Sequence, residues 1–412
     1  MMTKFLFSNC TLVDAVHYKT QPNMHLLVEN NLIKQISRDV IDVDNATIID
    51  LHNKILMPGL IDAHVHVTAS AFDLANDYIP VSEVTIQTER FLQNMLQRGF
   101  TTIRDAGGAD IGLYDAIESD LIAGPRLFYC GKALSQTGGH GDFRKANIGG
   151  DSYRCPCSAS NISRIADGIT EVRKAVRDEV RKGATHIKIM GSGGVASPTD
   201  RITNLQYSRE EIAAIVEEAT NAGIYVMAHA YSPQAIIRCV ELGVRTIEHG
   251  NLLNEESAKV MSSKGAYLVP TLVIYDALKN LGKQNGISPE SMAKVDIVKN
   301  QGLAAIKIAR EYGIKIGFGT DLLGVVGQLL ESQEFTIRSQ VESALQILES
   351  ATAVNADIIN QKDKLGVIKE GAFADLLVVN KNPLDDITTL THPEKYLELV
   401  MKNGVIYKNK LF

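Results

Sequence analysis

The stretch Leu60-Ile-Asp-Ala-His-Val-His-Val67 is a short apolar run that carries two histidines and follows the turn signal Pro58-Gly59. Its length and the proline and glycine before it predict a β-strand. Side chains alternate between the two faces of a strand, so His64 and His66 are expected to point the same way. Two imidazoles placed in this manner can bind one metal ion. The stretch therefore predicts a strand that ends in a metal site.

Beyond this stretch the chain alternates apolar runs of strand length with amphipathic runs of helix length. The candidate strands are residues 60–67, 100–105, 126–133, 184–190, 224–230, 244–249, 266–273 and 314–321. The candidate helices are residues 84–98, 110–121, 163–182, 208–222, 233–242, 254–264, 290–312 and 336–353. Eight strands, each followed by a helix, predict an α/β fold of the (β/α)8 or TIM barrel type. A doubly wound parallel sheet is the structural alternative.

Short strands return on both sides of this alternating region. Residues 3–58 contain apolar runs bounded by Asn, Asp and Pro, and residues 374–379 and 397–407 show the same pattern. We expect residues 1–58 and 359–412 to pair into one small β-sandwich domain. The barrel would then comprise residues 59–358.

Further residues of the kind that bind metals fall at the ends of later candidate strands. His229 ends the fifth strand, His249 the sixth and Asp321 the eighth. The carboxyl ends of all strands in a parallel barrel lie on one rim, where active sites are built. Four histidines and a carboxylate on that rim predict metal-assisted chemistry, in which the carboxylate can also accept a proton.

Lys188 lies in the fourth candidate strand between Ile187 and Ile189, so its amine is expected inside if the isoleucines face the helices. An ammonium group beside a divalent cation is strongly repelled. A buried lysine can lose its proton, and the free amine can then add carbon dioxide to become a carbamate. This N6-carboxylysine would be an anionic ligand able to bridge two metal ions. The alternative is an ion pair between Lys188 and an acid on the barrel floor.

Composition narrows the class of protein. The 412 residues include 42 Lys and Arg against 48 Asp and Glu, a formal net charge of −6, and no basic tract; nucleic acid is therefore not an expected partner. No run of about 18 apolar residues predicts a membrane span, and no signal-peptide pattern opens the chain, so we expect a cytoplasmic protein. The five cysteines form no disulfide framework, and Cys155 and Cys157 are expected to be loop thiols.

Seven motifs are spread over essentially the whole chain. They are Met57-Pro-Gly-Leu-Ile-Asp-Ala-His-Val-His66, Gln136-Thr-Gly-Gly-His-Gly-Asp142, His186-Ile-Lys-Ile-Met-Gly-Ser-Gly-Gly194, Met227-Ala-His-Ala-Tyr231, Ile247-Glu-His-Gly250, Phe318-Gly-Thr-Asp321 and Gly371-Ala-Phe-Ala-Asp-Leu-Leu-Val-Val379. Together they resemble the amidohydrolase superfamily, and within it the imidazolonepropionase-like branch of metal-dependent dipeptidases, prolidases and carboxypeptidases.

The resemblance implies two divalent metal ions, with zinc the first choice for imidazole and carboxylate ligands. His64 and His66 would bind the more buried ion, and His229 and His249 the more exposed one. Carboxylated Lys188 would bridge both ions. Asp321 would bind the buried ion and shuttle the proton.

The resemblance also singles out His140, in a glycine-rich loop, and Tyr231, two residues beyond His229. Both would contact the substrate, one holding its α-carboxylate and the other polarising the scissile carbonyl, in an order that stays open. A loop-capping histidine and a rim tyrosine are the plain alternatives. We expect the loop of residues 192–206 to form one wall of the pocket, and Glu248 to face outward toward a helix.

These features predict a binuclear metal-dependent hydrolase of dipeptides or N-acyl amino acids that carry a free C-terminal carboxylate. The resemblance favours an Xaa-Pro dipeptidase (prolidase) or related carboxypeptidase, and the expected site, with about one net positive charge, would attract the carboxylate of such a substrate. One alternative is a cyclic amide hydrolase of the imidazolonepropionase type, which resembles the same superfamily but typically uses one metal ion. Another is a non-catalytic relative, which usually loses ligands. The expected partners are a small-molecule substrate and further copies of the chain, with no membrane.

Overall fold

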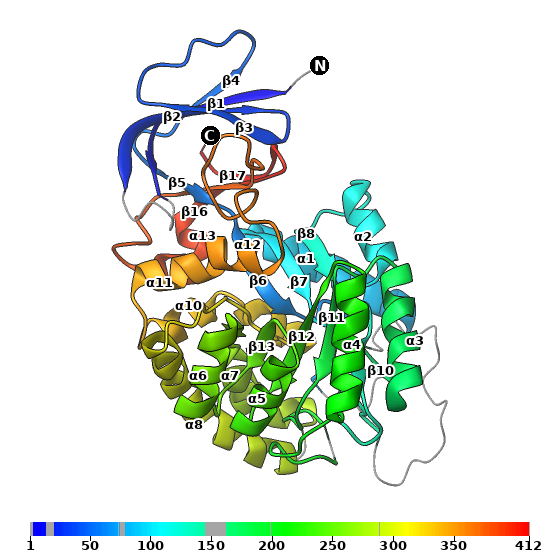
Figure 1. Cartoon of the computed structure of the whole chain (residues 1–412). Helices are drawn as coiled ribbons and strands as arrows, with labels where there is room; N and C mark the ends of the chain where they lie inside the picture. The colour runs from blue at the N-terminus through cyan, green and yellow to red at the C-terminus, as the bar shows by residue number, and fades with distance from the viewer. Residues whose placement is uncertain are drawn as a thin grey trace.

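The computed structural model describes residues 3–13, 20–72, 74, 79–144, 162–197, 199–287 and 289–411. Figure 1 shows a strand-rich part that holds β1 and β17, and a larger part in which strands are surrounded by helices. The first and last strands of the described chain therefore lie in the same part of the molecule.

The two terminal segments join in one eight-stranded sheet, in the order β17-β16-β15-β5-β1-β2-β3, with β4 beside β1. Its strands are β1 Lys4–Leu12, β2 Gln21–Glu29, β3 Leu32–Ser37, β4 Thr47–Asp50, β5 Ile55–Pro58, β15 Leu376–Val379, β16 Leu397–Lys402 and β17 Val405–Asn409. Antiparallel pairing of β5 with β15 connects the two segments. Because β5 leads directly into β6, this sheet also fixes where the next strand begins.

The remaining strands are parallel and belong to two sheets, β6-β7-β8 and β10-β9-β11-β12-β13-β14. They are β6 Leu60–Val65, β7 Phe100–Asp105, β8 Arg126–Tyr129, β9 Ala133–Ser135, β10 Ser163–Ile165, β11 His186–Met190, β12 Tyr225–Ala230, β13 Thr246–His249 and β14 Tyr267–Val269.

Backbone hydrogen bonds connect these two sheets at both edges. The amide of Thr185, the residue before β11, donates to the carbonyl of Tyr129 in β8 at 2.8 Å and so joins the two sheets. At the other edge, Gly317 donates to Leu268 of β14 and Ala63 of β6 donates to Phe318, each at 2.8 Å. Hydrogen bonds therefore lead from β6 through both parallel sheets and back to β6.

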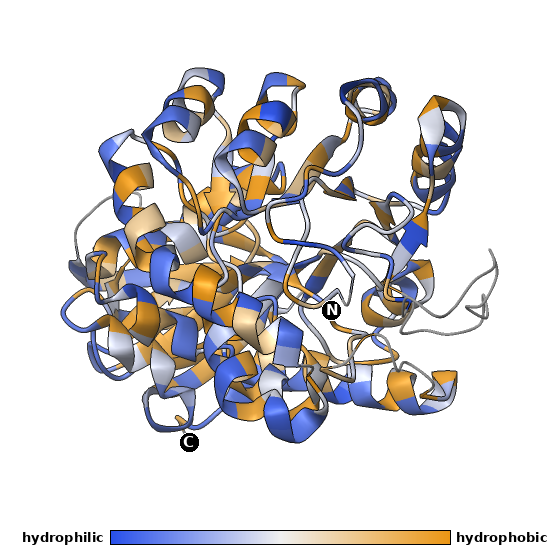
Figure 2. Ribbon diagram, turned by 90° about the horizontal axis from the view of Figure 1, so that it is seen from below, coloured by the Kyte–Doolittle hydropathy of each residue, from blue (hydrophilic) through white to orange (hydrophobic). Residues whose placement is uncertain are grey.

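Helices follow most of the parallel strands. They are α1 Val81–Gln97, α2 Ile111–Glu118, α3 Gly168–Arg181, α4 Arg209–Asn221, α5 Pro233–Glu241, α6 Glu255–Lys264, α7 Leu272–Leu281, α8 Pro289–Glu311, α9 Gly324–Gly327, α10 Gln333–Arg338, α11 Ala344–Glu349, α12 Asn355–Ile358 and α13 Pro393–Tyr396. In α3 the buried residues Val172, Ala175, Val176 and Glu179 recur at helical spacing. Figure 2 shows this alternation of hydrophobic and hydrophilic segments along the helices.

Two predicted strands differ from the observed structure. Residues 266–273 form only the three-residue strand β14, because Pro270 ends the run and helix α7 begins at Leu272. Residues 314–321 form no strand, although Ile316 makes a parallel bridge to Leu268. The segment is held close to β6 by Gly319, where an added Cβ would lie 2.8 Å from that of His64.

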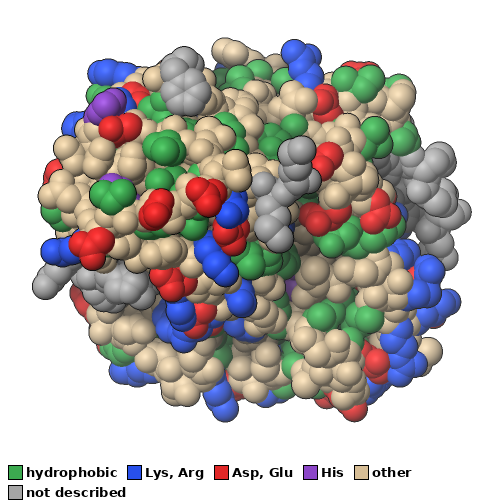
Figure 3. All heavy atoms as spheres, turned by 90° about the horizontal axis from the view of Figure 1, so that it is seen from above, with side chains coloured by type: hydrophobic (Ala, Val, Ile, Leu, Met, Phe, Trp, Pro, Cys, Tyr) green, Lys and Arg blue, Asp and Glu red, His purple; other side chains and the backbone are tan. Residues whose placement is uncertain are grey.

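The described surface gives no sign of one dominant charge on the face shown in Figure 3, where acidic and basic side chains are interspersed. Among the described residues, no helix combines the length and the apolar character that a membrane crossing requires. Cys155 and Cys157 lie outside the described residues.

Candidate metal centre and active site

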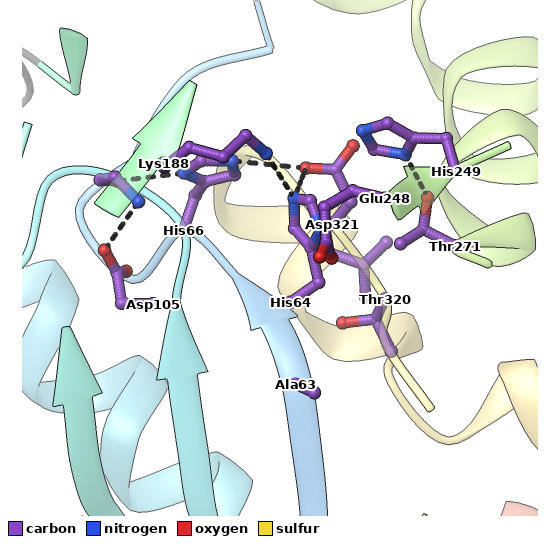
Figure 4. A network of polar contacts seen from close by, with 12 residues as sticks. Ala63, His64, His66, Asp105, Lys188, Glu248, His249, Thr271, Thr320 and Asp321 are labelled. Atoms are coloured by element: carbon purple, nitrogen blue, oxygen red, sulfur yellow. Dashed lines mark hydrogen bonds and ion pairs between the residues drawn. The ribbon is translucent and has the colours of Figure 1, made fainter. Parts of the chain in front are cut away.

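His64, His66 and Asp321 form a cluster whose ligand atoms all lie within 4.8 Å of one another. One oxygen of Asp321, Oδ1, is 3.4 Å from Nε2 of His64 and 3.3 Å from Nε2 of His66. Figure 4 shows the two imidazoles and the carboxylate turned toward one another, with the amine of Lys188 beside them. This arrangement of two nitrogens and one oxygen can hold a divalent metal ion.

The backbone explains why residues 257 positions apart meet here. His64 is the next-to-last residue of β6, and its carbonyl accepts a hydrogen bond of 2.8 Å from the amide of Asp321. Gly319 allows this close approach because it has no side chain. The alternation of side chains along β6 and the hydrogen bonds from β6 to residues 318–321 therefore together place Asp321 beside the two histidines.

His229, His249 and Lys188 line the same pocket. The ring centroids of His229 and His249 are 4.6 Å apart, and those of His249 and His64 are 5.0 Å apart. Nζ of Lys188 lies 3.5 Å from Nε2 of His64. The structure thus brings together all six residues that the sequence analysis selected as metal ligands.

The hydrogen bonds of the four histidines fit a metal-binding role. Nδ1 of His66 is 2.9 Å from the carbonyl of Gly107, and Nδ1 of His249 is 2.7 Å from Oγ1 of Thr271. Nδ1 of His64 is bound to a carboxylate described below. In His229 it is Nε2 that contacts a carbonyl, that of Gly193, at 3.1 Å. Each ring therefore has one nitrogen held by an outer partner, which leaves the other as a ligand atom, as is common for metal-binding histidines.

Glu248 is the outer partner of His64, and our expectation that it faces outward is wrong. Its Oε2 lies 2.7 Å from Nδ1 of His64, and both its oxygens accept from the guanidinium of Arg104, at 2.9 and 3.0 Å. Both side chains are completely buried. Burial alone would raise the pKa of Glu248, but the charge of Arg104 and the hydrogen bond from His64 lower it well below its ordinary value. Glu248 is therefore a buried anion that orients His64.

The backbone at His249 explains why the prediction for Glu248 was wrong. Thr246 and Glu248 share the inner face of β13 and are hydrogen-bonded to each other. His249 follows with φ of 69°, in the left-handed region, so the strand's alternation ends there and His249 also reaches the pocket. Asp321 has φ of 55° as well. Such angles are uncommon outside glycine and cluster at functional sites.

The amine-bearing side chain of the pocket is Lys188, which is buried with 2% of its surface exposed. Burial lowers the pKa of its amine below the ordinary value, which favours the neutral form. A neutral amine is the form that reacts with carbon dioxide, so burial shifts Lys188 toward the state that a lysine carbamate requires.

His140 and Tyr231 also line the pocket, beside the apolar residues Leu74, Phe143, Ile162, Met190, Val195, Ala196, Ile274, Leu278 and Leu323. Val195 and Ala196 belong to the loop that we expected to form a wall. The ring of His140 stacks on that of His229, with centroids 4.2 Å apart. The hydroxyl of Tyr231 is 2.9 Å from that of Tyr275, and burial raises the pKa of Tyr231.

Sequence reasoning missed Tyr275 and Thr271, the partners of Tyr231 and His249. Thr271 lies in the segment 266–273, for which the sequence predicted a strand, and Tyr275 lies in helix α7, which begins within that segment. Their only signal was Pro270, which ends an apolar run just before them.

Comparisons with known proteins agree with this geometry. A model described as the amidohydrolase family matches residues 55–407. The ochratoxinase of Aspergillus niger is 35% identical over 370 residues, which cover 86% of this chain and 76% of that protein. The crystal structure of a prolidase complexed with N-methylphosphonate-L-proline is 47% identical, with a TM-score of 0.95 over 99% of this chain and 100% of the other. A Xaa-Pro dipeptidase with bound methionine in its active site is 31% identical, with a TM-score of 0.88 over 99% and 100%.

Proposed function

Because this chain belongs to the amidohydrolase family and is a hydrolase of amide bonds, we propose that it is a binuclear metal-dependent dipeptidase. Its substrates would be dipeptides, foremost Xaa-Pro, or N-acyl amino acids with a free carboxylate. The observation that carries the proposal is the convergence of all six ligand-type side chains on one pocket that also holds His140 and Tyr231. The likeness to a prolidase and a Xaa-Pro dipeptidase over nearly the whole chain supports the substrate class.

The proposed ligands are His64, His66 and Asp321 for the more buried ion, and His229 and His249 for the more exposed one. Lys188, as N6-carboxylysine, would bridge the two. Imidazole and carboxylate donors suit zinc. The outer hydrogen bonds assign the ligand atoms as Nε2 in His64, His66 and His249, and Nδ1 in His229.

Divalent ions held by these residues would supply Lewis-acid chemistry at the substrate carbonyl and would make bound water more acidic. The side chain of Asp321 accepts the proton of the attacking water and then delivers it to the leaving nitrogen. Tyr231 and His140 orient the substrate from the side of the pocket where His229 lies. The apolar walls exclude bulk water, which strengthens the polar contacts made inside.

The alternative reaction that a metal site of this kind could catalyse is hydrolysis of a cyclic amide of the imidazolonepropionase type. The position of Lys188 beside His64 favours the binuclear site over it, because a single-metal enzyme has no use for a bridging ligand. A non-catalytic role is disfavoured, since all six ligand-type side chains are present.

The architecture belongs to the same proposal. We infer a (β/α)8 barrel of residues 59–358, on the basis of the hydrogen bonds that lead from β6 back to β6. Residues 1–58 and 359–412 would form a small β-sandwich domain around their own buried cluster, which includes Phe7, Leu26, Leu56 and Val378.

The first test is release of free amino acids from a complete library of L-dipeptides by zinc-loaded protein, with N-acetylated amino acids included. We expect cleavage concentrated on Xaa-Pro or on one class of C-terminal residue. If two metal ions are bound and the whole library stays intact, the dipeptidase proposal is wrong and cyclic amides become the leading substrates.

A further inference from the structure

Between β11 and α4, the described residues 191–197 and 199–207 belong to a loop that covers one side of the pocket. Two backbone hydrogen bonds hold its ends together, from Gly193 to the carbonyl of Asn204 at 3.0 Å and from Gln206 to that of Gly191 at 3.1 Å. Its centre contains Asp200, which is buried with 6% of its surface exposed. A buried carboxylate needs several donors to stay ionised, so its partners are informative.

The partners of Asp200 come from the loop and from helix α8. Its Oδ2 accepts from the amide of Gly194 at 3.2 Å and from Nε2 of Gln206 at 2.8 Å, and its Oδ1 accepts from the hydroxyl of Ser197. The ammonium of Lys294 lies 3.5 Å from Oδ1. It also donates to the carbonyls of Gly194, at 3.1 Å, and Ser197, at 2.9 Å. Lys294 therefore ties α8 to the part of the loop that lines the pocket.

His140 is attached to this network at two atoms. Its amide donates to Oε1 of Gln206 at 2.8 Å, and its Nδ1 lies 2.8 Å from Oγ of Ser197. The hydroxyl of Ser197 has one proton, which it donates to the carboxylate of Asp200. Oγ can therefore only accept from His140, so the proton of the imidazole is on Nδ1. This leaves Nε2 for a ligand in the pocket.

Packing fixes the plane of the same ring. One face of His140 stacks on His229, with an angle of 26° between the rings. The ring also lies close to Gly194, where an added Cβ would be 2.2–2.5 Å from three ring atoms. His229 and Gly194 therefore restrict the plane of the His140 ring, and Ser197 determines its tautomer. Of these three residues, only His229 is a proposed metal ligand.

We propose that Ser197, Asp200 and Lys294 are positioning residues that hold His140 with its proton on Nδ1 and its Nε2 turned to the substrate. The assignment of a substrate to this pocket rests on the proposed function, but the tautomer does not. Sequence alone gave no reason to connect residues 140, 197, 200 and 294.

The primary test is Ser197→Ala, because it removes one hydroxyl and keeps the Asp200–Lys294 ion pair, whereas Asp200→Asn would place an amide donor against other donors. We expect kcat/KM for the best dipeptide to fall on the order of tenfold, with unchanged metal content and melting temperature. Ser263→Ala, which removes an exposed hydroxyl from α6, is the matched control.

A double-mutant cycle separates positioning from general support of the fold. In a His140→Ala background, Ser197→Ala should change kcat/KM by less than about twofold, because the group it positions is gone. An undiminished tenfold loss in that background, or full activity of Ser197→Ala alone, would overturn the proposal.

The contribution of Lys294 is tested with Lys294→Met against Lys299→Met, which removes a second ion-paired lysine from the same helix. We expect only Lys294→Met to lower kcat/KM. Equal rates for both variants and the wild type would remove Lys294 from the proposal.

A readout without substrate keeps the inference separate from the proposed function. In protein labelled with 15N-histidine, the ring signals missing from His140→Ala belong to His140. They should report a protonated Nδ1 in the wild type and lose that preference in Ser197→Ala. If the wild type cleaves no dipeptide but shows this tautomer, only the proposed function fails; if the proton is on Nε2, the positioning proposal fails.

Discussion

At the scale of single residues, the pocket depends on which nitrogen of each imidazole is free. Gly107, Thr271, Gly193 and Glu248 each hold one ring nitrogen of a histidine that we propose as a ligand. Three of these partners are neutral, whereas Glu248 carries a charge that Arg104 balances. His64 is therefore the histidine whose outer partner is charged, and a hydrogen bond to a carboxylate orients a ligand more strongly than one to a neutral carbonyl does.

Glu248→Gln tests this arrangement. The amide has one acceptor oxygen where the carboxylate has two, so it cannot serve both Arg104 and His64 as the carboxylate does. We expect metal affinity to fall by about 10–100-fold, measured by titration of metal-free protein with zinc. Glu241→Gln, at an exposed ion pair with Arg209, should bind zinc as the wild type does. Unchanged affinity in Glu248→Gln would show that the carboxylate does not act through His64.

Lys188→Ala tests the proposed carbamate. Without the bridging ligand the protein should bind less metal and lose most of its activity, as measured by elemental analysis and dipeptide hydrolysis. Short carboxylic acids added with metal should restore part of the rate, because they can occupy the space of the missing carbamate. Lys259→Ala changes an exposed lysine and serves as the control. Full metal content and full rate in Lys188→Ala would exclude a bridging role.

At the scale of elements, helix α7 supplies much of the pocket wall, and its first turn is held by a distant residue. Thr271 precedes the helix but makes no capping hydrogen bond with its side chain, which is instead engaged with His249. Oε2 of Glu334, in α10, accepts from the amide of Val273 at 2.7 Å. A residue about sixty positions later in the chain thus satisfies a free amide of the first turn.

Glu334→Gln yields a prediction about pH. Burial raises the pKa of Glu334 from 4.5 to about 8. Between these values the unfolded carboxyl has lost its proton and the folded one keeps it, so the folded state binds more protons. The stability of the wild type should therefore fall with rising pH, relative to Glu334→Gln, by at most about 1.4 kcal/mol per pH unit.

The measurement is urea unfolding of both proteins at several pH values between 5 and 8. Glutamine keeps an acceptor for the amide of Val273, so the helix start is preserved. Glu311→Gln, at an exposed position of α8, should show no such trend against the wild type. A constant stability difference between wild type and Glu334→Gln over this range would contradict the shifted pKa.

At the scale of the whole molecule, the proposed metal ligands come from strands spread along the chain from β6 to the segment after α8. A metal ion bound to them stabilises the folded state only, by about 4 kcal/mol when its concentration is 1,000 times the dissociation constant. Treatment with a chelator should therefore lower the melting temperature, and added zinc should restore it.

The matched control is the double variant His64→Ala/His66→Ala, which lacks both histidine ligands of the more buried ion, so its melting temperature should respond less to chelator and zinc than that of the wild type. The comparison is made by calorimetry at equal protein concentration, because self-association would also shift the transition. A wild-type protein that melts at the same temperature with and without its metal ions would show that the site is not coupled to folding.

The sequence by itself predicted that His64, His66, Lys188, His229, His249 and Asp321 lie close together, and in the structure all six line one pocket. Alternation along a strand and the common direction of parallel strands account for His64, His66, Lys188 and His229. His249 reaches the pocket through a left-handed backbone, and Asp321 belongs to a segment that forms no strand. The sequence also predicted that the two terminal segments meet, since both have the pattern of short strands on either side of a region of alternating strands and helices. The pairing of β5 with β15 agrees with this. Family membership, expected from motifs, is confirmed by the match over residues 55–407.

Only the tertiary structure decided which residues support this rim. Glu248 and His249 both face inward although they are adjacent, because His249 has a left-handed backbone, and no sequence pattern marks that turn. Helix α7, the Tyr231–Tyr275 contact and the network from Lys294 to His140 all depend on segments far apart in the chain. Local patterns fix which face a side chain occupies, but partners across the pocket are set by the packing of whole elements, and that information is not local.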